Sequence, residues 1–122
     1  MLVLGMRKRT VKWAPAGVSL VLMPLSEERD QALVDETTER VIDDNGRVTD
    51  VKRDVPRYVQ LVGRECIRGW EGVTDEAGNV VDCTPEAIDE FMQIQPAREF
   101  VLGKVRGLDL WLRGETDAAK KG

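Results

Sequence analysis

Apolar residues near the N-terminus occur in short runs that are typical of β-strands. Two such runs, 10–13 and 18–23, flank the segment 14–17, which contains proline and glycine, and this arrangement predicts a β-hairpin. The second run is largely apolar, so we expect it to be buried on both faces or covered by a helix. Pro24 follows it and is expected to end the strand.

A helix is predicted after this hairpin, over residues 27–41. Ser26 can cap its first turn, where two glutamates follow and favour the positive end of the helix dipole. The apolar residues of this segment are sparse, which predicts one exposed side. Thr37 and Thr38 weaken the prediction for its later half, because β-branched residues lose rotamer freedom in helices.

A strong turn signal, Asp-Asp-Asn-Gly at 43–46, follows this helix. The segment 48–51 after it is expected to form a short strand or a loop. We expect this region to be the most mobile internal part of the chain and the part that best tolerates changes in length.

The second helix is the best defined by its pattern. Asp54 can cap it, and Pro56 is accepted in the first turn, where its missing N–H has no partner to lose. One continuous helical face is predicted from Val55, Tyr58, Val59, Val62, Cys66, Ile67 and Trp70. Gly69 and Gly72 then interrupt the pattern, and a turn is expected at 75–79 between two very short strands.

Two more helices are predicted in the C-terminal third. Thr84-Pro85 marks the first start, and Ile88, Phe91 and Met92 give its inner face. Pro96 ends that helix and opens the last one. One side of the last helix is expected to consist of Phe100, Val101, Val105, Leu108, Trp111 and Leu112, with a stop at Gly114.

These elements predict an α+β fold in which an N-terminal β-hairpin packs against a bundle of about four helices. The 122 residues, of which 42% are apolar and 33% charged, are expected to form a single domain over 1–122. The segments 1–8 and 115–122 are predicted to be flexible termini, and Met6 is an alternative start of the ordered chain.

The net charge is −4, which argues against non-specific nucleic-acid binding. The one dense basic run is Arg7, Lys8, Arg9 and Lys12. We interpret it as a solvated strand edge that charge protects from pairing with other chains. A contact with nucleic acid or with a protein partner is the alternative interpretation.

The chain begins without the apolar region of a secretory signal and contains no run of about 20 apolar residues that would span a membrane. The expected location is therefore the cytoplasm, where thiols stay reduced. Cys66 is expected to be a buried small apolar residue. Cys83 precedes a helix start, where a thiolate is mildly stabilised, and a reactive role is the minor alternative for it.

No pattern in the sequence indicates catalysis or a cofactor. The chain has no histidine, the usual general base near neutral pH and the commonest zinc ligand. It also lacks the glycine motifs that hold nucleotides. The acidic turns at 43–46 and 75–79 do not have the spacing of a calcium-binding EF-hand, so we interpret them as ordinary turns. We therefore expect no enzyme activity, no catalytic residues, no metal and no cofactor.

The tryptophans are the residues most suited to a protein contact. Trp70 and Trp111 lie on predicted helical faces, where core packing is the first expectation and an interface anchor the alternative. Trp13, on the first strand near basic residues, is expected to be the most exposed of the three.

The stretch 66–79, Cys-Ile-Arg-Gly-Trp-Glu-Gly-Val-Thr-Asp-Glu-Ala-Gly-Asn, resembles a pattern found in small phage and prophage proteins. In these proteins a helix ends in an (I/V)xxWxGVxDxxG turn, a Thr-Pro-Glu helix start follows, and a proline separates two helices. Segments 83–86, 95–100 and 24–29 fit the remaining features. The resemblance covers most of 10–113 and is to tail assembly chaperones, which are encoded among tail genes.

The resemblance implies that the chain binds the long helical tape measure protein before the tail tube forms around it. Covering the apolar helix faces of such a partner suppresses its aggregation. The contact surface is expected at the turn of Trp70 and Glu71 and on the last helix, and self-association is possible in this family. Two other functions stay open: a small structural tail or adaptor protein of the virion, and a DNA-binding or antitoxin-like regulator.

Overall fold

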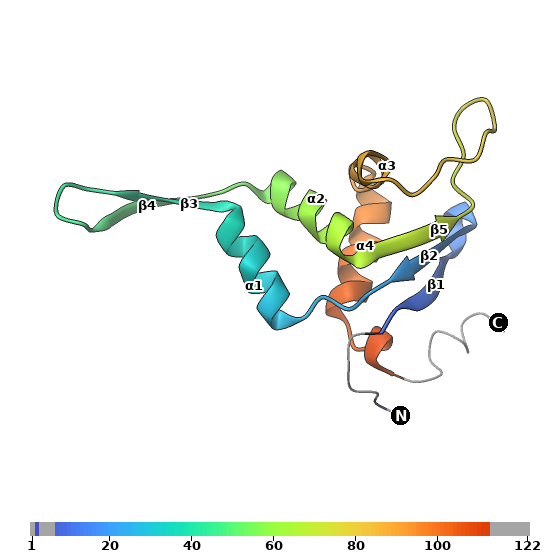
Figure 1. Ribbon diagram of the computed structural model, residues 1–122, viewed down its shortest axis with the longest axis horizontal. Coiled ribbons are helices and arrows are strands. Elements are labelled where there is room, and N and C mark those ends of the chain that lie inside the picture. Colours follow the sequence, from blue (N-terminus) through green and yellow to red (C-terminus); the bar gives the residue numbers. More distant parts are fainter. Residues whose placement is uncertain (1, 3–6, 113–122) are drawn as a thin grey trace.

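The computed structural model describes Leu2 and residues 7–112 (Figure 1). The terminal segments 1–8 and 115–122, expected to be flexible, lie mostly or wholly outside the described residues, as does the predicted stop at Gly114. The elements in chain order are β1 (Arg9–Trp13), a 3-10 turn η1 (Ala14–Ala16), β2 (Val18–Leu22), α1 (Glu27–Glu36), β3 (Thr38–Ile42), β4 (Val48–Arg53), α2 (Val55–Cys66), β5 (Ile67–Glu71), α3 (Pro85–Phe91), α4 (Gln95–Arg106) and η2 (Asp109–Trp111).

The larger sheet is antiparallel with the order β1-β2-β5, so the predicted N-terminal hairpin gains a third strand from the middle of the chain. Val18, Leu20 and Leu22 alternate with half-buried residues along β2, which confirms that helices cover one face of this strand. The basic strand β1 is an edge of the sheet, as the interpretation of the basic run expected.

The helices pack against the inner face of this sheet and around α2, which contacts α1, α3, α4 and β5. Val62 and Cys66 of α2 are fully buried, as are Val101 and Val105 of α4. The α+β class with an N-terminal hairpin and four helices in the described chain is therefore confirmed.

The first helix is shorter than predicted: α1 ends at Glu36, and residues 38–42 form β3 instead of the last helical turn. The Thr37 hydroxyl donates to Leu33 O at 2.8 Å and the Thr38 hydroxyl to Val34 O at 2.6 Å. These bonds satisfy carbonyls at the helix end, and the β-branched pair then favours extended backbone. The two threonines are thus a boundary between helix and strand.

The continuous helical face predicted up to Trp70 is wrong in its last part. The α2 helix ends at Cys66, and Ile67–Glu71 forms β5 on the open edge of β2. A bulge in the pairing of β2 with β5 sets Ile67 opposite Leu22 and Trp70 opposite Leu20, so the two residues share a face in the strand as they would in a helix. The free edge of β2 decides the outcome, because pairing there satisfies backbone groups that would otherwise be buried without partners.

The last helix is also shorter than predicted, since α4 ends at Arg106 and Asp109–Trp111 forms a 3-10 turn. Leu110 is buried there, while Leu108, expected on the inner side, is exposed. Around the turn at 75–79, only an isolated bridge between Thr74 and Val80 replaces the two expected short strands.

The second sheet is the two-stranded antiparallel ribbon β3–β4, which projects away from the rest of the molecule (Figure 1). We call residues 38–53 the arm. The turn predicted at 43–46 closes it, and of the two alternatives for 48–51 the structure shows the strand. Beyond Thr38 every residue of the arm is exposed.

Candidate functional site

An open, largely apolar groove lies where α2 meets the end of α3 and α4. Its volume is about 620 Å³. Val59 and Leu102 are half-buried in its walls, Met92 is buried, and Val55 is 53% exposed at the end next to the arm. The remaining lining residues are Pro56, Gln60, Asp89, Gln93 and Arg98. An apolar interior with a polar rim is the composition of sites that take an amphipathic helix.

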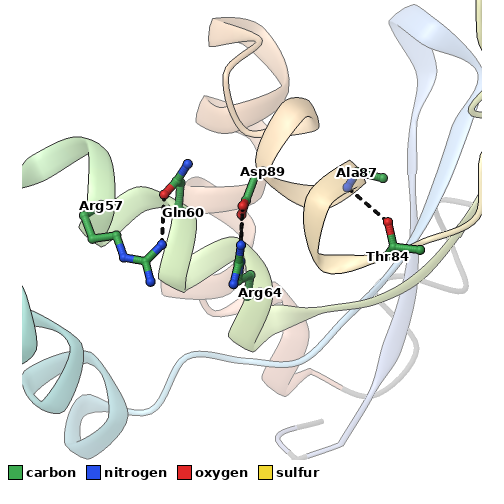
Figure 2. Close-up of polar contacts among 6 residues, drawn as sticks. All are labelled: Arg57, Gln60, Arg64, Thr84, Ala87 and Asp89. Carbon is green, nitrogen blue, oxygen red and sulfur yellow. Dashed lines mark hydrogen bonds and ion pairs between the residues drawn. The ribbon is translucent and has the colours of Figure 1, made fainter.

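Polar contacts fix the side of the groove formed by α2 and α3 (Figure 2). Arg64 binds the Asp89 carboxylate with two N–H groups, and its Nε lies 2.8 Å from Oδ1. This guanidinium lowers the pKa of Asp89 below its usual range. Nearer the start of α2, Arg57 donates to Gln60 Oε1 at 3.1 Å. The two contacts hold the rim side chains in place, which reduces the entropy that a partner must remove on binding.

The α3 side of the groove is positioned by a helix cap. The Thr84 hydroxyl accepts from Ala87 N–H at 3.2 Å (Figure 2), and Pro85 occupies the first helical position, as the sequence predicted. Gly63 of α2 allows close approach to α3: a Cβ there would lie 2.5 Å from Met92 Cγ. The absence of a side chain at Gly63 therefore sets the distance between the two helices.

Exposed apolar side chains concentrate on the arm and at the start of α2 that follows it. Of the large apolar side chains that are exposed in the described chain, most lie between positions 41 and 55: Val41, Ile42, Val48, Val51 and Val55. The register pairs Ile42 with Val48 and Arg40 with Val51. Paired residues point to the same face of a ribbon, so three apolar side chains share one face of the arm.

Two of the predicted contact residues, Trp13 and Trp70, come together in the structure. Phe91 lies between them, with ring centroids 6.0 Å from Trp13 and 5.4 Å from Trp70. Trp13 also lies 6.2 Å from the Phe100 ring. Both tryptophans are half-buried and pack on the core. Each therefore stabilises the packing of the sheet against α3 and α4, independently of any partner.

The other two predicted contact residues lie apart from this cluster. Glu71 is exposed at the end of β5, opposite Ser19, and Trp111 is half-buried in η2. Trp70 also borders a smaller hollow of about 200 Å³, and its indole N–H donates to Val81 O at 2.8 Å. The structure thus does not unite the four residues into one site.

The groove residues Val59 and Leu102 and the apolar face of the arm were not predicted as contact residues. Val55 and Val59 were assigned to one continuous helical face, and the exposure of this face depends on where α3 and α4 end. Valines and isoleucine on both sides of an Asp-Asp-Asn-Gly turn are a hairpin signal. That signal was available in the sequence at 41–51 but does not show that the hairpin stands clear of the core.

The cysteines and the buried tyrosine have high pKa values. Burial raises the pKa of the Cys66 thiol to about 12, consistent with the predicted buried apolar role. Burial also raises the pKa of Cys83, which favours the neutral thiol and argues against a reactive role for this residue. Burial and the hydrogen bond to Asp30 raise the pKa of Tyr58, whose hydroxyl also accepts from Arg106 and so links α1, α2 and α4.

The two acidic turns bind their own backbone, as predicted. Asp43 Oδ1 accepts from Asn45 N–H and Arg47 N–H, each at 2.9 Å. Asp75 Oδ1 accepts from Asn79 N–H at 2.9 Å and from the residue at 77, which lowers the pKa of Asp75. In the described chain no three His, Cys, Asp or Glu residues gather within reach of one metal ion. No described helix has both the length and the apolar character needed to cross a bilayer.

Comparison with known protein families, with characterised proteins and with solved structures finds no match to this chain.

Proposed function

We propose that this protein is a phage or prophage tail assembly chaperone that binds the tape measure protein, without enzyme activity and without a cofactor. The sequence resemblance over 10–113 suggests this function. The single structural observation that supports it is the groove between α2, α3 and α4, with apolar walls at Val59 and Leu102. A groove of this composition suits one face of an amphipathic helix.

The charge at the rim indicates which helix fits best. Arg98 lies at the groove, while the other charged lining residue, Asp89, is already paired with Arg64. The groove is therefore cationic on balance, and we expect it to prefer an apolar helix face flanked by carboxylates. Segments of this kind in an unassembled tape measure would be shielded from water and from one another.

The experiment is co-expression with the tape measure protein of the same tail gene cluster, measuring the soluble fraction of the partner. The Val55→Asp variant places a charge at the groove, at the first position of α2, where an acidic residue is compatible with the helix. We expect it to weaken binding about tenfold and to lower the soluble yield of the partner. Val80→Asp is the matched control, since Val80 is 81% exposed outside the groove.

A tape measure that is equally soluble with and without this protein would refute the proposed function. If Val55→Asp and Val80→Asp weaken binding of the partner equally, the binding surface lies away from the groove.

A structural tail or adaptor protein of the virion is the second candidate, and the projecting arm favours it. Permanent assemblies use such extensions to reach neighbouring subunits, and the arm is exposed along its whole length beyond Thr38. Mass spectrometry of purified particles separates the two functions, because a virion subunit stays in the particle and a chaperone leaves it. A regulator that binds DNA is less favoured: Arg9 of the basic run is half-buried, with its Nε inaccessible to solvent.

A further inference from the structure

The outer edge of β4 is an unusual surface in this fold. Among the described strands only β3 is its neighbour, and all six residues of β4 are exposed. The Val51 N–H donates to the Asp50 carboxylate at 2.8 Å, so it points to the outer edge of the strand. Such an edge is a template for another strand, and a two-stranded ribbon alone is only marginally stable in water.

The charges on this edge identify the strand that fits it. The sequence of 49–53 is Thr-Asp-Val-Lys-Arg, in which Asp50 and Lys52 flank Val51 with opposite charge. If a second copy is placed antiparallel with the two Val51 residues opposite each other, Asp50 of each copy lies opposite Lys52 of the other. Opposite charges at directly facing positions stabilise a pair of strands.

We propose that the outer edge of β4 pairs with the same edge of a second copy of this chain, antiparallel and centred on Val51. The result is one four-stranded sheet in the order β3-β4-β4-β3, with a two-fold axis at Val51. The Val51 N–H and C=O then bond the partner's backbone, and the Asp50 carboxylate leaves its own backbone for Lys52 of the second copy. The proposal does not depend on the proposed function.

The shape of the molecule permits this pairing. The arm stands clear of the helices and of the larger sheet (Figure 1). Antiparallel strands run in opposite directions, so the bodies of the two copies lie at opposite ends of the new sheet. The tip of each arm then lies beside the start of the partner's α2, where Val55 is exposed.

The same charges disfavour other partners. A strand that does not place opposite charges at the positions facing Asp50 and Lys52 leaves these residues opposite apolar or like-charged side chains, which costs free energy. A second copy avoids that cost. The contact covers only five residues of each strand and is small beside standard interfaces, so we expect a dimer that forms in a concentration-dependent way.

The test is sedimentation velocity of the full chain over a concentration series. We expect a monomer of 13.7 kDa to convert to a dimer as concentration rises. The single variants Asp50→Lys and Lys52→Asp each place like charges opposite each other at two symmetric positions, and each should raise the dissociation constant about tenfold. The double variant carrying both changes restores the opposite charges and should dimerise like the unmodified chain.

Mixing the two single variants gives a more specific test. In the mixed dimer the lysines at 50 and 52 of one chain face the aspartates of the other, so heterodimers should form where each variant alone stays monomeric. Val51→Pro is the second kind of variant: it removes the N–H at the centre of the outer edge, and proline is tolerated on edge strands. It should abolish dimerisation while the far-UV circular dichroism stays unchanged.

A single species of 13.7 kDa up to about 1 mM would overturn the proposal. A dimer that persists in all the single variants, or a mixture of the two charge variants that does not associate, would also overturn it, because the contact would then lie elsewhere.

Discussion

Replacing Gly72 by alanine is the sharpest test of how the chain leaves the larger sheet. Gly72 follows β5 with φ at 90°, a conformation that side chains disfavour by about 1 to 2 kcal/mol. A Cβ at this position would also lie 2.6 Å from the carbonyl oxygen of Gly17, which belongs to the backbone of the turn before β2. Neither group can rotate away, so the contact must be relieved by moving one of the two chain segments.

The expected cost follows from three contributions. Overpacking against a fixed neighbour costs about 1 to 3 kcal/mol. Alanine also lowers the conformational entropy of the unfolded chain, which offsets about 0.4 to 1 kcal/mol of the destabilisation. Together with the unfavourable φ, these values predict that Gly72→Ala lowers the free energy of unfolding by about 1 to 4.5 kcal/mol, with a middle value of about 3 kcal/mol. At this chain length, that is a fall in Tm of about 10 °C.

Gly78→Ala is the matched control. Gly78 has nearly the same φ, 84°, but a Cβ there would meet nothing within 4 Å. It should therefore show only the conformational part, about 1 kcal/mol or less. Urea unfolding followed by tryptophan fluorescence and by far-UV circular dichroism measures both variants. If the two variants lose the same free energy of unfolding, the reasoning is refuted, because the contact of the new Cβ with Gly17 O would then cost nothing.

Three further predictions concern ionisable side chains. In the native protein a thiol reagent should modify Cys83 slowly, and faster as pH rises, while Cys66 should react only after unfolding in urea. Tyr58→Phe should lower the free energy of unfolding by about 1 to 2 kcal/mol in urea titrations, because it removes the hydroxyl that joins α1 to α4. The pKa of Asp89 is lowered in the folded state, so the ion pair with Arg64 stabilises the fold above the usual carboxylate pKa. This stabilisation is lost as pH falls and Asp89 takes up a proton. The variant Asp89→Asn should therefore show a smaller dependence of the free energy of unfolding on pH between about pH 5 and pH 2.

The starts of the helices were predictable because each carries its own chemistry. Ser26, Asp54 and Thr84 all cap the helices that the sequence assigned to them. The ends were less predictable: α1 ends at its own threonines, but the end of α2 depends on a partner distant in sequence. Ile67 leaves the helical pattern only because β2 offers it a strand to pair with, and that edge exists only in the folded chain.

The groove was not predictable from the sequence, because none of the predicted contact residues lines it. The sequence singled out the tryptophans as contact residues, and this stays a prediction; in the structure Trp13 and Trp70 pack around Phe91 and are half-buried. The groove forms between three helices whose relative placement follows from contacts such as Gly63 against Met92. A single residue pattern does not encode such a distance, so the groove appears only with the fold.

The base of the arm explains how an uncovered ribbon can hold a fixed direction. Thr37 ends α1 through its hydroxyl, and its carbonyl accepts from Asp54 N–H at 2.8 Å. Asp54 in turn caps α2 by accepting from Arg57 N–H at 3.1 Å. The two helix ends and the two strand ends are thus tied at one point, so the arm is anchored to α1 and α2 without packing its own side chains on the core. Substitutions beyond Thr38 and before Arg53 should therefore alter association and leave the free energy of unfolding of the body almost unchanged, whereas Asp54→Ala should loosen the arm and α2 together.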